Sequence, residues 1–94
     1  MLDIVYTKRM KRDVKLMKKR GKDTTKLVKT LALLAERKTM PPNYRDHQLS
    51  GNLKDFRECH IGGEGDWLLL YQIFEEKLIL SAIGTGSHSD LFND

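Results

Sequence analysis

The sequence predicts an α+β fold in which an antiparallel β-sheet packs against an N-terminal helical hairpin, with elements in the order β-α-α-β-β-β. Three observations lead to this class: apolar residues at helical spacing in residues 8–38, three strand-like runs in residues 56–83, and a short β-branched segment at residues 2–6. The 94 residues suffice for one hydrophobic core, so we expect a single domain over residues 1–94.

The first strand and the first helix have clear boundary residues. Residues 2–6 are rich in β-branched and aromatic side chains, and Thr7 can cap a helix over residues 8–20 that Gly21 ends. Within this helix the apolar residues form one stripe, made of Met10, Val14 and Met17. We interpret the stripe as part of the core and not as a set of metal or cofactor ligands.

A second helix is predicted over residues 24–38, with Asp23 as its cap. Its apolar row consists of Leu27, Leu31 and Leu34, with Val28, Ala32 and Ala35 beside it. Pro41 and Pro42 are expected to end the helix, because proline lacks an N–H and excludes the helical conformation from the residue before it. A short turn joins the two helices, so they form a hairpin whose apolar stripes need a sheet to cover.

The C-terminal half has the pattern of an antiparallel meander. Residues 43–55 are polar and predict a loop. Residues 67–74 are almost wholly apolar, which is typical of a central strand covered on both faces, whereas residues 56–61 and 77–83 alternate. The turns between these runs have hairpin length, so neighbouring strands are expected to run antiparallel.

Charge is distributed unevenly along the chain. Residues 1–40 hold 13 lysines and arginines against 4 acidic residues, whereas residues 41–94 hold 4 against 9. A strongly basic half favours a polyanion or an acidic protein as partner. The alternative is that the lysines only form the solvated face of a helix.

The sequence also predicts the cellular compartment. A single cysteine, Cys59, excludes an internal disulfide, and we interpret it as a small core residue. The sequence has no apolar run of about 18 residues and no basic-then-apolar leader before the first strand. We therefore expect a cytoplasmic protein that does not bind a membrane.

Three histidines, all in the C-terminal half, lie in polar surroundings. Histidine exchanges protons near neutral pH, so His47, His60 and His88 together suggest acid–base chemistry on RNA, although any one of them alone is more often structural. In residues 56–61 alternation places Glu58 and His60 on one face, about 6–7 Å apart, and Cys59 on the other face with the core. A carboxylate beside an imidazole favours the protonated imidazole.

The remaining candidates lie around the other two histidines. If residues 56–83 form the antiparallel meander, His88 comes close to Asp66 or to His60, and His47 closes the same cleft. Trp67 and Phe92 are candidates for stacking on bases. The alternatives are a core anchor for Trp67 and docking onto the edge of the sheet for Phe92.

Four ordered motifs carry a resemblance over nearly the whole chain. They are Asp46-His47-x-Leu49-x-Gly51, Phe56-Arg57-Glu58-Cys59-His60, Asp66-Trp67-Leu68-Leu69-Leu70-Tyr71 and Thr85-Gly86-Ser87-His88-x-x-Leu91-Phe92. In this order and spacing they resemble the YafQ-type toxins, which belong to the RelE superfamily of bacterial toxin–antitoxin modules.

The resemblance implies a RelE-like microbial RNase fold and a toxin that is a metal-independent endoribonuclease without a cofactor. It further implies that the protein enters the ribosomal A site and cuts mRNA there by attack of the ribose 2′-hydroxyl on the adjacent phosphate, which inhibits translation. A cognate antitoxin is expected to bind and block it, and operator DNA is expected to be bound only through the antitoxin complex.

The site residues that the resemblance implies are catalytic positions at His47, His60, Asp66 and His88, a carboxylate at Glu58, and positions near the substrate base at Trp67 and Phe92. For the chemistry we expect His60 to act as base with help from Glu58, and His88 to act as acid. Protonated His47, with Arg57 or Lys54, would stabilise charge on the phosphate. The sequence alone is equally consistent with the reverse assignment, in which His88 is the base and His60 the acid.

Three other functions compete with this interpretation. A ParE-like toxin would share the architecture, bind gyrase and cleave nothing. A zinc site on the three histidines is a second alternative, although their spacings of 13 and 28 residues differ from the tight local pairs of structural zinc sites. A basic module that binds RNA and leaves it intact is the third.

Overall fold

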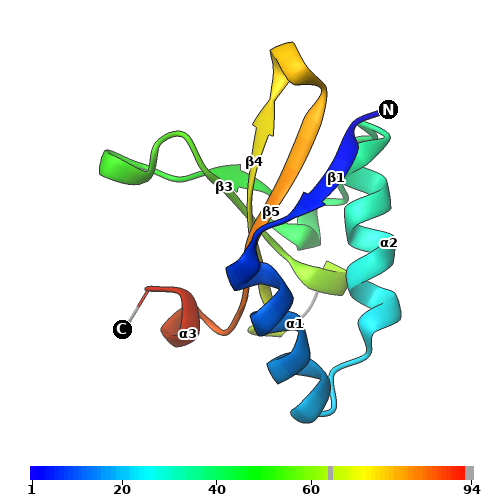
Figure 1. The fold of residues 1–94 in the computed structure, drawn as a ribbon, viewed down its shortest axis with the longest axis vertical. Coiled ribbons are helices and arrows are strands. Elements are labelled where there is room, and N and C mark those ends of the chain that lie inside the picture. The colour runs from blue at the N-terminus through cyan, green and yellow to red at the C-terminus, as the bar shows by residue number, and fades with distance from the viewer. Residues whose placement is uncertain (64, 93–94) are drawn as a thin grey trace.

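The computed structural model describes residues 1–63 and 65–92, and it confirms the α+β class (Figure 1). The helices and strands, in chain order, are β1 (Asp3–Tyr6), α1 (Lys8–Lys19), α2 (Thr24–Ala35), β2 (His47–Gln48), β3 (Arg57–His60), β4 (Leu68–Phe74), β5 (Ile79–Gly86) and α3 (His88–Phe92). Short 3₁₀ turns lie between them, at Pro42–Tyr44, Gly51–Leu53, Ile61–Gly63 and Glu75–Lys77.

The sheet has the order β1-β5-β4-β3-β2. Strands β3, β4 and β5 form the predicted antiparallel meander, and β2 adds a short antiparallel edge inside the segment that was predicted as a loop. Strand β1, however, pairs with β5 in parallel, so the sheet is antiparallel only from β5 to β2. A hairpin turn forces antiparallel pairing, whereas β1 is joined to the rest of the sheet through two helices and is free of that constraint.

The helices begin where the sequence predicts. The Thr7 hydroxyl accepts a hydrogen bond from the Met10 N–H, and the Asp23 carboxylate accepts one from the Thr25 N–H. Helix α2 ends at Ala35, earlier than the predicted residue 38. The cause is a left-handed residue, Arg37 (φ 58°), whose N–H bonds to the Leu34 carbonyl, so the helix stops before the prolines are reached.

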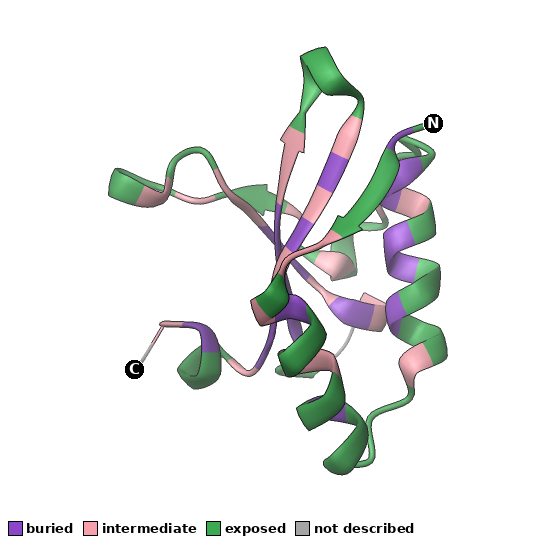
Figure 2. Cartoon of the chain, in the orientation of Figure 1, coloured by how far each residue is buried: buried purple, intermediate pink, exposed green. Residues whose placement is uncertain are grey.

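The main core lies between the two helices and one face of the sheet (Figure 2). Its members from the helices include Met10, Met17, Leu27, Leu31 and Leu34. The sheet adds Cys59, Leu69, Tyr71 and Leu80, and the segment between β3 and β4 adds Ile61 and Trp67. The predicted stripes are therefore largely correct. Val28 and Ala32 are exceptions, because Val28 is 62% exposed and Ala32 is exposed as well.

The opposite face of the sheet carries a smaller apolar cluster. Leu68 and Leu70 of β4 pack there against Leu91 of α3, with Phe56 and Phe92 at the margin. Strand β4 is thus covered on both faces, as its apolar run predicts. Because α3 covers only part of this second face, polar side chains of β2, β3 and α3 can approach one another there.

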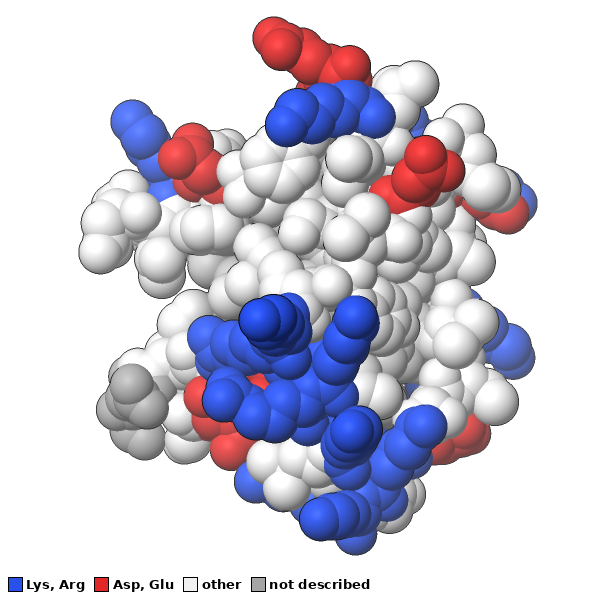
Figure 3. Space-filling view, in the orientation of Figure 1, with Lys and Arg blue, Asp and Glu red and all other residues white. Residues whose placement is uncertain are grey.

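The basic residues gather on the surface of α1 and the turn that follows it (Figure 3). Among the described residues, no helix is long and apolar enough to cross a membrane.

Candidate functional site

His88 is the first residue of α3, directly after the last strand. The helix begins with a reciprocal cap, in which the Ser87 N–H donates to the Asp90 carboxylate (2.8 Å) and the Asp90 N–H donates to the Ser87 hydroxyl (3.1 Å). The Asp66 carboxylate accepts a hydrogen bond from the His88 N–H (3.1 Å), which confirms the predicted proximity of Asp66 and His88. The start of α3 is thereby capped and bonded to Asp66, which lies just before β4.

His47 and Glu58 face each other across β2 and β3. They are register partners, and 4.0 Å separates His47 Nε2 from Glu58 Oε1. The His47 Nδ1–H donates to the Arg45 carbonyl (2.6 Å), so a proton gained at Nε2 would face the carboxylate. Glu58 is only 6% exposed, and a buried carboxylate needs a cationic partner.

One prediction about this pair was wrong. The sequence suggested Glu58 as the partner of His60, yet the carboxylate contacts His47, and no carboxylate of the described residues lies within ion-pair distance of His60. The reason is the short strand β2, which the sequence analysis missed inside a polar loop and which places His47 directly opposite Glu58.

A shared hollow of about 240 Å³ brings three of the candidate catalytic side chains together. It is lined by His47, Leu49, Ser50, Leu53, Glu58, His88 and Phe92. The rings of His88 and Phe92 lie in contact, with centroids 4.9 Å apart. Two imidazoles and a carboxylate thus share a pocket with an exposed aromatic edge, which suits proton transfer on a substrate that carries a base.

His60 lies on the same face of β3 as Glu58, two residues along the strand, and it lines a neighbouring hollow with Arg45 and Gly65. Its Nδ1 is bonded to the Gly65 carbonyl (2.9 Å). A carbonyl only accepts, so Nδ1 must carry the hydrogen, and the neutral ring then has its lone pair at Nε2. This is the tautomer that a general base at Nε2 requires.

Arg57 does not reach the hollow, which corrects its prediction as a substrate-binding residue. Alternation turns it to the opposite face of β3, where it donates to the Asp46 carboxylate (3.1 Å) and to the Tyr71 hydroxyl (3.2 Å). The Tyr71 hydroxyl donates to Asp46 in turn, and burial together with this bond raises the pKa of Tyr71. The network fixes Asp46, the residue before His47.

Sequence reasoning assigned no role to Asp46 or Tyr71. Tyr71 is concealed within an apolar run, and its position opposite Arg57 on β3 is visible only from the register of the two strands. The signal available in the sequence was Asp46 next to His47, since a short polar side chain beside a candidate catalytic residue often holds its loop.

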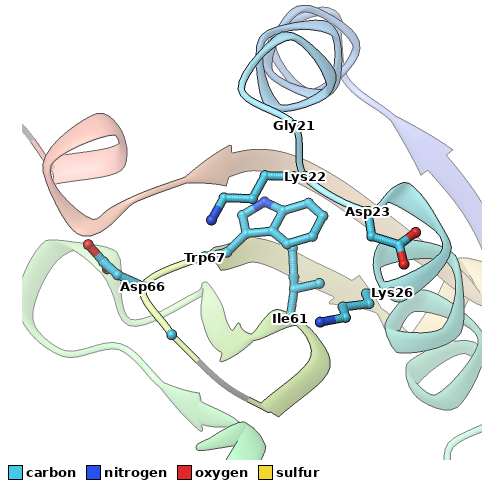
Figure 4. A pocket seen from close by; sticks show the side chains of 8 residues that line it. Gly21, Lys22, Asp23, Lys26, Ile61, Asp66 and Trp67 are labelled. Carbon is cyan, nitrogen blue, oxygen red and sulfur yellow. The ribbon is translucent and has the colours of Figure 1, made fainter.

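Trp67 is also corrected, from a stacking candidate to a core anchor. It is 5% exposed, and its indole N–H donates to the Thr85 hydroxyl (2.8 Å), which itself donates to the Leu68 carbonyl (2.7 Å). A ring so deeply buried cannot offer a face to a base. Trp67 instead forms part of the wall of a hollow of about 480 Å³ beside Asp66, which Lys22 and Lys26 also line (Figure 4).

Lys54 and Phe92 complete the predicted set. Lys54 is exposed, its carbonyl accepts from the Gln48 amide, and it is not among the residues that line the shared hollow. Phe92 is half-buried and lies in the hollow beside His88. Of the two, only Phe92 is placed to touch a bound base.

The described residues contain no group of three or more histidine, cysteine, aspartate or glutamate side chains arranged to hold a metal ion. The pair His47–Glu58 and the more distant His60 therefore do not form a recognisable ligand set in the part of the chain that the structure describes.

The fold and the sequence match one toxin family throughout. A family model described as the bacterial toxin of type II toxin–antitoxin system, YafQ, matches residues 2–93. The mRNA interferase toxin YafQ of Escherichia coli K12 is 38% identical over 91 residues, which cover 96% of this chain and 95% of that protein. A putative toxin YafQ of Haemophilus influenzae is 36% identical over 74 residues, covering 76% of this chain and 71% of the relative.

Solved structures of bacterial toxins are similar to the chain over nearly its full length. The metal-bound toxin from Helicobacter pylori superimposes with a TM-score of 0.89 at 43% identity, covering 98% of this chain and 100% of the other. The Escherichia coli DinJ–YafQ complex contains a chain with a TM-score of 0.85 at 36% identity, with 98% and 99% covered.

Proposed function

Since the chain belongs to the YafQ family of bacterial toxins of type II toxin–antitoxin systems, we propose that it is a metal-independent endoribonuclease that cleaves mRNA in the ribosomal A site and so stops translation. The observation that carries the proposal is the hollow that His47, Glu58 and His88 line together with Phe92. The curated relatives at 37–38% identity are named mRNA interferases, which supports an RNase activity.

The reaction divides two proton transfers between two histidines. The 2′-hydroxyl loses its proton to His60 Nε2, its oxygen bonds to the adjacent phosphorus, and the bond from phosphorus to the 5′-oxygen breaks. His88 donates a proton to that leaving oxygen, so the products are a 2′,3′-cyclic phosphate and a 5′-hydroxyl. The Nδ1 contact of His60 and the Asp66 contact of His88 support these roles, because each fixes one ring or its backbone.

The charge that develops on phosphorus needs a cation close by. His47 supplies it when protonated, and Glu58 stabilises the imidazolium from 4.0 Å. Glu58 therefore acts through His47 and not through His60. Phe92 is proposed to stack on the base next to the cut, since its ring lies against His88 in the same hollow.

The basic surface of α1 serves binding. Its lysines and arginines are proposed to contact phosphates of ribosomal RNA, which gives affinity without reading sequence. The same surface suits an acidic segment of a cognate antitoxin. The solved complex of a relative with DinJ supports such a partner.

The test is mRNA cleavage in a translating extract with chelator present, comparing the wild type with His47→Ala, His60→Ala and His88→Ala. We expect cuts at codon-periodic positions, and a loss of about 10²–10⁴-fold for His60→Ala and His88→Ala, the usual effect of removing a proton-transfer group. Lys77→Ala, in the exposed turn between β4 and β5, is the surface control and should cleave as the wild type does.

Three outcomes would contradict parts of the proposal. Intact mRNA while translation continues would favour a toxin that binds and does not cut. Near-wild-type cleavage by His88→Ala, with its fold verified by circular dichroism, would remove His88 from the mechanism. Loss of wild-type cleavage on chelation would replace metal-independent chemistry by a metal-dependent reaction.

A further inference from the structure

Two side chains of α1 and its C-terminal cap residue, Arg20, reach the end of β5 and the start of α3. Asp13 accepts from the Thr85 N–H (3.2 Å), and Arg9 contacts both Asp13 (3.4 Å) and the Asp90 carbonyl (3.5 Å). Arg20 makes two parallel contacts with the Asp90 carboxylate, at 2.7 and 3.3 Å. The basic helix thus does more than present charge to solvent.

The Arg20–Asp90 contact is the strongest of these links. It is bidentate, the geometry in which a guanidinium and a carboxylate bind most specifically. Asp90 Oδ2, which accepts the shorter of the two bonds, also accepts from the Ser87 N–H. Arg20 therefore holds the carboxylate that caps the turn on which His88 is the first residue.

A short helix needs such support. Helix α3 has five residues, and a helix of that length is not stable by itself. Its other attachments include the contact of Arg9 with the Asp90 carbonyl, the bond from the His88 N–H to Asp66 and the packing of Leu91. Without the Arg20–Asp90 contact, the start of the helix that carries His88 is held less firmly relative to His47 and Glu58.

We propose that Arg20 is a positioning residue for the reaction: through Asp90 it fixes the helix that carries the catalytic acid His88. The inference rests on the proposed function, since it assigns Arg20 to the rate of the chemical step. A displacement of about 1 Å in a catalytic group can cost on the order of 10²-fold in rate.

A different role for Arg20 makes opposite predictions. As one arginine of a basic surface, it would contact RNA directly, and its removal would raise the toxin concentration needed for half-maximal cleavage while the saturated rate stayed unchanged. Asp90→Asn separates the two roles clearly. The substitution removes a negative charge, which favours RNA binding, and it weakens the hydrogen bonds to Arg20. The amide oxygen of asparagine can still accept the hydrogen bond from the Ser87 N–H.

The experiment measures cleavage of mRNA on programmed ribosomes at increasing toxin concentration. We expect Arg20→Ala and Asp90→Asn each to lower the saturated rate about 10- to 100-fold, with half-saturation little changed. Arg20→Lys should recover part of the rate, and the double variant should be no slower than the slower single variant, because both remove the same contact.

The matched controls are Arg37→Ala and Glu75→Gln. These residues form a comparable arginine–carboxylate pair beside the turn after β4, at the end of the sheet opposite α3 (Figure 1). The same charges are removed, so any general effect of charge or stability appears in both pairs. Their saturated rates should equal that of the wild type.

Hydrogen exchange tests the anchor independently of cleavage. Arg20→Ala should speed exchange of the Ser87 and Leu91 amides by about tenfold, whereas Arg37→Ala should not. Unchanged exchange, or a saturated rate equal to wild type with weaker half-saturation, would overturn the positioning role. If the wild type itself leaves mRNA intact, the proposed function fails, and the exchange result alone decides whether Arg20 anchors α3.

Discussion

Thr85 connects three parts of the site at the scale of a single side chain. Its hydroxyl accepts from Trp67, donates to the Leu68 carbonyl, and its N–H is held by Asp13 of α1. The two hydroxyl bonds are made in the protein interior, where an unsatisfied polar group is costly. The residue is therefore a structural support beneath Asp66 and the start of α3.

We expect Thr85→Val to lower the free energy of unfolding by about 1–3 kcal/mol, because it leaves the buried indole N–H without an acceptor. Urea denaturation measures the change. Thr39→Val, in an exposed segment, is the control and should alter stability by less than about 0.5 kcal/mol. Equal stability of Thr85→Val and the wild type would show that Trp67 is held by packing alone.

Cys59 is expected to be chemically inert in the folded protein. It is fully buried, and burial raises the pKa of its thiol, so little of the reactive thiolate is present. A thiol reagent at pH 8 should modify it only as fast as the protein unfolds, and quickly in denaturant. Rapid modification of the native protein would mean that β3 opens from the core without global unfolding.

Sequence reasoning succeeded best for residues whose role depends on alternation along a strand. Cys59 and Glu58 were placed on the correct faces of β3 in this way. It failed for Arg57, and for Trp67 it left stacking and a core anchor both open, because a motif indicates proximity to the substrate but not the direction of the side chain. Which partner satisfies a polar group depends on contacts between segments, and these lie outside local sequence.

At the scale of elements, α3 and its supports form the most sensitive part of the site. Asp90 folds back so closely that a Cβ added at Gly86 would lie 2.7 Å from the Asp90 Cβ. Both are Cβ atoms attached directly to the backbone, so neither can move away by a rotation of its side chain. The junction of β5 and α3 consequently has no room for a larger residue at position 86.

Gly86→Ala should therefore displace Asp90 and α3 without any change of charge, and lower the saturated rate of mRNA cleavage by at least about tenfold. Cleavage kinetics together with the exchange rate of the Ser87 amide provide the measurement. Wild-type values for both quantities would show that the junction can widen at no cost to the site.

The Arg20–Asp90 contact also predicts how the stability of the protein depends on pH. The hydrogen bonds from Arg20 and Ser87 lower the pKa of Asp90 in the folded protein. A lowered folded pKa contributes stability that is present above the unfolded pKa of about 4 and is lost as the pH falls through the folded value. The stability difference between the wild type and Asp90→Asn should thus be full at pH 7 and shrink progressively below pH 4, as acid titrations of denaturation would measure.

The order and type of the main elements were predictable because periodicity and caps are local signals. Helix α1 and strand β4 follow directly from them. Strand β2 was not predictable, since its two residues have no periodicity and pair only because β3 offers an edge. The parallel pairing of β1 likewise depends on the path of the whole chain.

On the scale of the whole molecule, positive and negative charges lie in different regions. Basic residues gather on α1, whereas the carboxylates of Glu58 and Asp66 lie near the site. A surface that binds phosphates releases counterions, so its affinity falls with salt. Under the proposed function, the basic helix supplies affinity for phosphates, and the hollow lined by His47, Glu58 and His88 supplies the chemistry.

Binding to ribosomes should weaken markedly between low and high ionic strength. Lys11→Gln with Lys15→Gln, both on exposed positions of α1, should reduce the slope of log affinity against log salt by roughly 0.7–0.9 for each phosphate that the variant no longer neutralises. Lys77→Gln, at the far turn, should leave the slope as it is. Ribosome binding that salt does not weaken would contradict the role of α1.

The parallel contact of β1 with β5 has a consequence for how the protein is made. In the described sheet β1 lies at an edge and pairs with β5 alone. During synthesis β1 therefore cannot pair until β5 has been made. Loops that span most of a chain close late, because their entropy is lost before the contact forms. A ribosome-bound fragment that ends before β5 has neither the completed sheet nor His88, so under the proposed function such a fragment could not cleave the mRNA from which it is being translated.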